Sequence, residues 1–183
     1  QKTVSIPQNT LRKMIGETIF AVSNNESRPI YTGILFEVGE GYLTMVAVDG
    51  YRLAMRKEAL DHDDGEKFSF IVPGASLSDL EKICSDTDED VRMTLGAKHI
   101  SFTLGDTVLI SRRLEGEFIN YRKSIADNFA VKALVQRSEL ARAVDRVSLI
   151  IDSKTINPVR CIFGDGEINI SCTTSLGKAF DTC

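Results

Sequence analysis

Hydrophobic and polar positions along the chain repeat one arrangement three times. In each copy, a short apolar stretch rich in β-forming residues meets polar residues, and apolar positions at helical spacing follow. The three junctions lie at 6–11, 72–77 and 135–140, and each ends on a leucine. The pattern therefore predicts, in every copy, a strand that leads directly into a helix.

The expected first strands span 3–6, 68–72 and 131–135. Each predicted helix buries one apolar face, since its apolar residues recur three or four positions apart. These faces comprise Leu11, Ile15, Thr18, Ile19 and Val22 in the first copy, Leu77, Leu80 and Cys84 in the second, and Leu140, Ala143, Val144 and Val147 in the third.

Three further β-rich runs, separated by turn residues, follow each predicted helix. We expect these strands at 34–38, 42–48 and 51–56, at 91–95, 99–104 and 107–113, and at 159–163, 168–173 and 179–183. Each copy is thus a β-α-β-β-β unit, and the predicted fold class is α+β, with antiparallel sheets that carry their helices on one face.

A single unit of this kind leaves sheet edges and apolar surface open, which pairing of units resolves. We therefore predict one domain of two units at 1–126 and a third unit, half of another domain, at 127–183. The chain is expected to begin inside a longer protein and to stop one unit short. The third unit then either pairs with a second copy of itself or stays a loosely ordered monomer, with Leu140, Val144 and Val147 partly unprotected.

Composition fits a soluble globular protein, because 43% of the 183 residues are hydrophobic and 26% are charged. No apolar stretch approaches the roughly 20 residues of a membrane-spanning helix. The cysteines include no closely spaced pair, so neither a zinc site nor a disulfide framework is expected, and a reducing cytoplasm fits best. They are Cys84, Cys161, Cys172 and Cys183.

The net charge of −4 argues against a protein that binds nucleic acid over its whole surface. Acidic residues gather at 61–66 and 86–90, as is typical of solvated loops. The run at 61–66 also allows a rival interpretation as a metal site of an enzyme, although its spacing matches neither an EF-hand loop nor a His-Glu-x-x-His helix. A protein-interaction module that does not bind nucleic acid is a further alternative.

Several stretches resemble the bacterial DNA sliding clamp, the beta subunit of DNA polymerase III. In order and spacing, 28–33, 47–54, 71–73 and 115–121 resemble the middle domain of that family. Further along the chain, the residues that resemble the first half of its C-terminal domain are Ile150, 152–154 and 158–160. An Asp-Gly-aromatic-Arg-Leu stretch followed by Gly-x-Phe-x-x-Tyr is specific in combination, whereas each motif alone is weak.

The resemblance implies a non-catalytic processivity factor without cofactor or metal. Three-domain protomers of the family close head to tail as a homodimeric ring around duplex DNA and tether the replicative polymerase. A ring that slides needs only modest positive charge on its helices, because tight phosphate binding would stop it. The candidate DNA-facing residues are Arg12, Lys13, Asn24, Asn25, Arg28, Arg137, Arg142 and Arg146; for each one, a solvated surface position is the alternative.

The family also implies a cleft, between the second and third domains, for short peptides of the polymerase, the clamp loader and repair proteins. An apolar floor with a few polar groups suits such a peptide. The corresponding residues are Tyr31, Val48, Gly50, Tyr51, Arg52, Leu53, Ile119, Lys123, Ser124 and Ile156.

Three positions depart from the family pattern and affect the expected peptide preference. Val48 replaces a common Thr, Tyr51 a frequent His, and Ile119-Asn120 the usual Pro-Asp. Asp49-Gly50, taken alone, would indicate no more than a tight two-residue hairpin.

Overall fold

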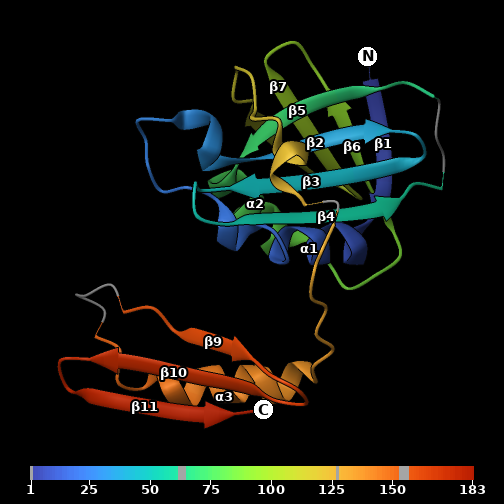
Figure 1. The fold of residues 1–183 in the computed structure, drawn as a ribbon. Helices are drawn as coiled ribbons and strands as arrows, with labels where there is room; N and C mark the ends of the chain where they lie inside the picture. Colours follow the sequence, from blue (N-terminus) through green and yellow to red (C-terminus); the bar gives the residue numbers. More distant parts are fainter. Residues whose placement is uncertain (1, 62–64, 127, 153–156) are drawn as a thin grey trace. The chain divides into compact units, whose positions relative to one another are not determined.

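The chain is described by a computed structural model that covers residues 2–61, 65–126, 128–152 and 157–183. It divides into two compact units, Gln1–Ile125 and Ala126–Cys183 (Figure 1). Within the described ranges, no helix combines the length and apolar character that a membrane span requires.

The first unit contains two copies of the predicted β-α-β-β-β arrangement. Short 3-10 turns η1 (Ile19–Ala21) and η2 (Pro29–Thr32) lie inside the first copy, between its helix and its second strand, and η3 (Tyr121–Ser124) follows the second copy. The first copy comprises β1 (Lys2–Pro7), α1 (Gln8–Gly16), β2 (Gly33–Gly39), β3 (Tyr42–Val48) and β4 (Leu53–Ala59), and the second β5 (Phe68–Pro73), α2 (Gly74–Ile83), β6 (Asp90–Leu95), β7 (His99–Leu104) and β8 (Thr107–Arg112).

The two copies exchange their first strands. The antiparallel sheets have the orders β4-β3-β2-β5 and β1-β6-β7-β8, so β5 pairs with β2 of the first copy and β1 with β6 of the second. A β-α-β-β-β unit taken by itself predicts one sheet made of its own four strands, and the observed pairing differs from this prediction. Each exchanged strand covers the edge that β2 or β6 of the other copy would otherwise leave open, and the exchange ties the two copies into one domain.

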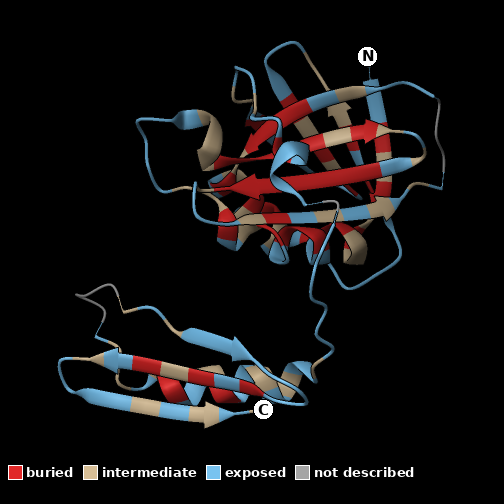
Figure 2. Cartoon of the chain, in the orientation of Figure 1, coloured by how far each residue is buried: buried red, intermediate tan, exposed pale blue. Residues whose placement is uncertain are grey.

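A single large core fills the first unit, as the buried positions in Figure 2 indicate. Helices α1 and α2 lie side by side on the same side of this unit (Figure 1). In α1, Leu11, Met14 and Ile15 are fully buried at the expected helical spacing. The helix ends at Gly16, earlier than predicted, and Thr18 donates its hydroxyl to the carbonyl of Met14 at 2.8 Å. Beyond it, Ile19 and Ala21 reach the core from the 3-10 turn η1, and Val22 from the residue that follows.

The second unit contains α3 (Arg137–Ser148), β9 (Arg160–Phe163), β10 (Ile168–Thr174) and β11 (Gly177–Thr182). Its antiparallel sheet has the order β11-β10-β9, and α3 covers one face through a small core. Val147, which we expected to be partly unprotected, is buried in that core, while Leu140 and Val144 are half-buried.

The predicted strand at 131–135 was wrong, since this segment is not a strand. Its counterparts in the first unit, β1 and β5, are strands only in pairing with the neighbouring copy. Residues 126–183 hold one copy, so no strand of that kind is available to 131–135 within the described part of this unit.

Candidate functional site

A second apolar cluster, here called the outer cluster, lies on the face of the β4-β3-β2-β5 sheet that points away from the core. Successive residues of a strand alternate between the two faces of a sheet. Leu35 and its cross-strand partner Val46 therefore lie on one face, and the core residue Phe36 lies on the other. The outer cluster comprises buried Leu35, Val46, Ile71 and Tyr121 and half-buried Ile30, Leu53, Leu114 and Phe118.

Residues 114–124, here called the arch, run across this cluster. At one end, the backbone N–H of Leu114 donates to the carbonyl of Ile71 at 3.0 Å. At the other end, the Tyr121 hydroxyl donates to Glu37 at 2.5 Å, and Arg122 forms an ion pair with the same carboxylate at 2.7 Å. Burial, together with the hydrogen bond to Glu37, raises the pKa of Tyr121 to about 12. Tyr121 therefore stays protonated as a donor.

Two close contacts set the middle of the arch. Phe118 meets Tyr31 edge to face, with ring centroids 5.6 Å apart. Gly116 has a φ of 135°, and a Cβ there would lie 2.2 Å from Ile30. The positive φ favours glycine here, and any other residue would also displace the end of the Ile30 side chain, which gives the glycine of the Gly-x-Phe motif a structural reason.

The loop between β3 and β4 is built around Asp49. Its carboxylate accepts the backbone N–H of Tyr51 at 3.0 Å and of Arg52 at 3.1 Å, and binds the Arg52 side chain at 2.8 Å. The N–H of Tyr51, with help from Arg52, holds the pKa of Asp49 below its ordinary value. The turn spans four residues, and so both the two-residue hairpin and the predicted start of the next strand at Tyr51 were wrong.

The same loop presents two candidate peptide-binding side chains. Tyr51 is completely exposed. The Arg52 guanidinium lies over the ring of Phe20 at 5.6 Å, and so it is already in contact with an aromatic face as well as with Asp49. Gly50 adopts a φ of 95°, which favours glycine at this turn.

The other candidates of the first unit are distributed along the outer cluster and the arch. Leu53 packs into the cluster and pairs in register with Val48, which is buried. Ile119 is 37% exposed on the arch, and Lys123 and Ser124 are exposed in η3. Ile156 lies outside the described residues.

Three residues near these candidates were missed: Phe118, Phe20 and Met55. Phe118 is the aromatic of the Gly-x-Phe motif. Met55 alternates with Leu53, pairs with Val46 and is 46% exposed, so strand alternation alone would have placed it on the outer face. Phe20 comes after the helix end that periodicity did not locate.

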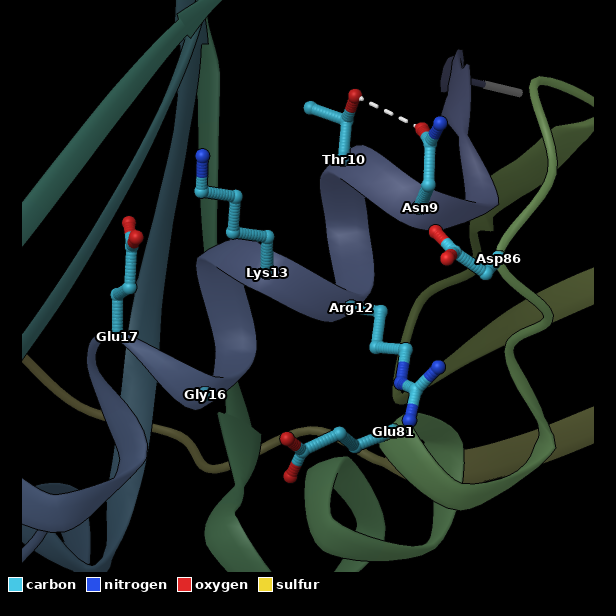
Figure 3. A pocket seen from close by; sticks show the side chains of 8 residues that line it. All are labelled: Asn9, Thr10, Arg12, Lys13, Gly16, Glu17, Glu81 and Asp86. Atoms are coloured by element: carbon cyan, nitrogen blue, oxygen red, sulfur yellow. Dashed lines mark hydrogen bonds between the residues drawn. The ribbon is translucent and has the colours of Figure 1, made fainter.

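The predicted basic surface of the first unit is of mixed charge. Arg12 and Lys13 are exposed and line a hollow of about 630 Å³ that is shown in Figure 3. Arg12 reaches toward α2 and Glu81, whereas Lys13 extends in another direction (Figure 3). The remaining lining residues are Asn9, Thr10, Gly16, Glu17 and Asp86.

The other DNA-facing candidates differ in whether their side chains already bind another part of the chain. Arg146 forms an ion pair with Asp181 of β11, and the hydrogen bond from Arg146 holds the pKa of Asp181 below its ordinary value. Asn25 accepts the backbone N–H of Ser27 at 3.0 Å and so shapes its own loop. Asn24, Arg28, Arg137 and Arg142 are exposed.

A metal site at 61–66 is not tested by the structure, because 62–64 lie outside the described residues. Among the residues that the structure does describe, no group of three or more His, Cys, Asp or Glu side chains is arranged to hold a metal ion.

Known proteins resemble this chain in both sequence and fold. The family model for the central domain of the DNA polymerase III beta subunit matches residues 5–120. A beta sliding clamp from Staphylococcus aureus is 33% identical over 171 residues, covering 93% of this chain and 45% of the relative. The chain thus spans about half the length of the curated relatives it matches.

Two solved structures illustrate the similarity in fold. A putative DNA polymerase III beta subunit from Eubacterium rectale matches with a TM-score of 0.94 and 27% identity, over 100% of this chain and 50% of that one. A DNA polymerase sliding clamp from Bacillus subtilis matches with a TM-score of 0.92 and 30% identity, over 100% and 48%.

Proposed function

Because the chain belongs to the DNA polymerase III beta-subunit family, the bacterial sliding clamps, we propose that it forms part of a ring that encircles duplex DNA and tethers the replicative polymerase. The predicted resemblance and the α+β clamp fold are confirmed by the matches. Sliding clamps are non-catalytic components of the polymerase holoenzyme, in agreement with the prediction that the chain is not an enzyme. Its place of action would be the bacterial cytoplasm.

Within that ring, residues 1–126 would be the middle domain and 127–183 the first half of the C-terminal domain. The match of the central-domain model to residues 5–120 supports the first assignment. The second assignment is supported by the likeness between the units, since α3 is followed by three antiparallel strands, as α1 and α2 are.

The outer cluster is the observation that carries the proposed peptide site. Leu53 is half-buried in the cluster, and half-buried Tyr31 contacts the arch through Phe118, next to exposed Ile119. Arg52 in the loop before β4, and Lys123 and Ser124 in η3, would supply the polar groups. Burial of one or two peptide side chains there would contribute about 1.5–3 kcal/mol each. An interaction of that size exchanges readily, as a clamp that serves several partners requires. Gly50 and Tyr51 would border the groove, and Ile156 is the remaining residue of the proposed set.

A loose electrostatic contact with DNA fits the helices of the chain. Arg12 and Lys13 share their hollow with carboxylates, and the net charge is −4. Few counterions would be released from the DNA when it contacts such a surface, so the electrostatic contribution to affinity would be small. Enclosure by the ring, rather than tight phosphate binding, would keep the DNA in place. Asn24, Asn25, Arg28, Arg137, Arg142 and Arg146 would add to it.

A peptide titration tests the proposed site. The probe is a short fluorescent peptide with a leucine and a phenylalanine, and Leu53→Ala in this chain should weaken its binding about ten- to hundredfold, because an apolar anchor contact is lost. Leu109→Ala is the matched control, since Leu109 is also half-buried but packs against the core instead. Equal affinity of the Leu53 variant and the unaltered chain would exclude this groove as the docking site.

A further inference from the structure

We infer that Glu37 is a positioning residue for the proposed peptide site, acting through Tyr121 and Arg122 to hold the arch in its binding shape. This inference rests on the proposed function. The three residues, here called the Glu37 clasp, join β2 to η3 across more than eighty residues of sequence. None of the three is among the candidate peptide contacts, although all three line the same hollow as Ile119.

The clasp has the geometry of a specific attachment. Glu37 Oε2 accepts the Tyr121 hydroxyl at 2.5 Å and Arg122 Nη2 at 2.7 Å, while Oε1 accepts Arg122 Nη1 at 3.2 Å. The guanidinium therefore donates hydrogen bonds to both carboxylate oxygens. A lysine side chain cannot form this planar, two-bond arrangement. Its carbon also lies 4.7 Å from the centre of the Tyr121 ring. The side chain of Glu37 is 26% exposed, which shields these bonds in part from water.

The clasp matters because the arch has few other attachments. Leu114 fixes one end through its backbone bridge to Ile71. Among the described residues, no backbone hydrogen bond joins 115–120 to a strand of the sheet. The position of this stretch is thus set by Leu114, by the Glu37 clasp and by side-chain packing between them.

The peptide-facing residues of the arch lie between or next to these attachments. Phe118 and Ile119 lie three and two residues before Tyr121, and Lys123 and Ser124 follow Arg122 in the same 3-10 turn. Release of Glu37 would leave the buried Tyr121 hydroxyl without its carboxylate partner and free the far end of the arch. The apolar residues at the rim of the groove would then no longer be held in one arrangement. A peptide would have to order them as it binds, and this ordering would weaken its binding.

Glu37→Gln tests the role with two readouts on the 183-residue chain. The first is the affinity for the short leucine- and phenylalanine-containing peptide, expected to fall about tenfold, because charge-assisted hydrogen bonds are lost. The second is the rate of trypsin cleavage after Arg122 or Lys123, expected to rise, while cleavage after Lys57 in β4 stays unchanged. Glu37→Asp keeps a carboxylate and should restore part of both.

Glu40→Gln is the matched control. Glu40 pairs with Lys67 at 2.6 Å beside the same sheet but is largely exposed and does not hold the arch. Its substitution should leave both readouts as they are in the unaltered chain. Tm is measured for every variant, since a local role predicts only a small change in the Tm of Glu37→Gln.

The outcomes separate the inference from the function on which it rests. Faster cleavage after Arg122 or Lys123 with unchanged peptide affinity overturns the positioning role and leaves the proposed function standing. Equal acceleration at Lys57, with a large fall in Tm, marks Glu37 as a general structural residue and also overturns it. Failure of the unaltered chain to bind the peptide overturns the proposed function, and the positioning role with it.

Discussion

The two units of the chain follow one sequence pattern but reach different structures. In Gln1–Ile125, two copies exchange their first strands, and each exchanged strand closes the edge of a sheet. In Ala126–Cys183, the single copy forms its helix and three strands, while 131–135 remains irregular. The helix and the three-stranded meander therefore depend on contacts within a copy, whereas the first strand depends on a neighbouring copy.

Burial follows the same division. In β1, Val4 and Ile6 are 6% and 2% exposed, whereas at the corresponding positions of the second unit Ala133 is exposed and Val135 is half-buried. All four residues of β9 are exposed too, although its counterparts β2 and β6 lie inside their sheets. The comparison indicates that the first unit holds most of the stabilising apolar burial of the chain.

The largest expected effect is on the core of the first unit. Phe36 is fully buried and stacks on Phe70 with ring centroids 5.0 Å apart. Phe36→Ala should reduce the free energy of unfolding of this unit by about 3–5 kcal/mol, because it removes an aromatic side chain and leaves a cavity. Urea unfolding followed by tyrosine fluorescence measures it, since all tyrosines of the chain lie in this unit.

Phe180→Ala is the control for that substitution. Phe180 is 74% exposed on β11, and its removal should change neither the tyrosine transition nor the stability by more than about 0.5 kcal/mol. Similar losses for both variants would contradict the uneven distribution of burial between the units.

Local patterns predicted much of this fold, and non-local contacts account for the failures. β3 at 42–48 and β7 at 99–104 have the bounds expected from alternation between turns. The exchange of first strands and the irregular 131–135 depend on which copy lies alongside, which periodicity does not record. The shifted start of β4 reflects hydrogen bonds of the Asp49 side chain that strand propensity does not include.

The candidate site shows the same limit. The family motifs located Leu53 and Tyr31, which do lie in or beside the outer cluster. The Glu37 clasp was not predicted, because its members are far apart in sequence and Glu37 occupies an ordinary polar position of a strand. Whether the peptide-binding and DNA-facing residues act as expected stays a prediction.

The next expected effect is on amide exchange. Amides of 131–135 and of β9 should exchange much faster than those of β1 and β6, since the former lack the inter-copy ladder that protects the latter. Hydrogen exchange with mass spectrometry measures this at low and high chain concentration. Protection that rises with concentration would indicate pairing of two third units, and constant fast exchange a monomer. Equal protection of 131–135 and β1 in dilute solution would contradict the comparison.

The smallest expected effect concerns acid stability of the second unit. Asp181 on β11 accepts a hydrogen bond from the side chain of Arg146 on α3, and this bond holds the pKa of Asp181 below its ordinary value of 3.8. A carboxyl whose pKa is lower in the folded state stabilises that state above its unfolded pKa, and the contribution is lost as the pH falls through the folded pKa. Asp181→Asn should therefore weaken the second unit slightly at neutral pH, with a difference from the unaltered chain that disappears toward strongly acidic pH.

The effect of Asp181→Asn is small because Arg146 is half exposed, so water screens the pair. Urea unfolding monitored at the methyl resonances of Ile170 isolates the second unit, since Ile170 is buried in its small core. Asp49→Asn is the matched control, because the pKa of Asp49 is lowered by similar bonds within the first unit. That substitution should leave the Ile170 transition unchanged at every pH. A pH-independent loss in Asp181→Asn would show that the contact between α3 and β11 depends on packing rather than on the ion pair.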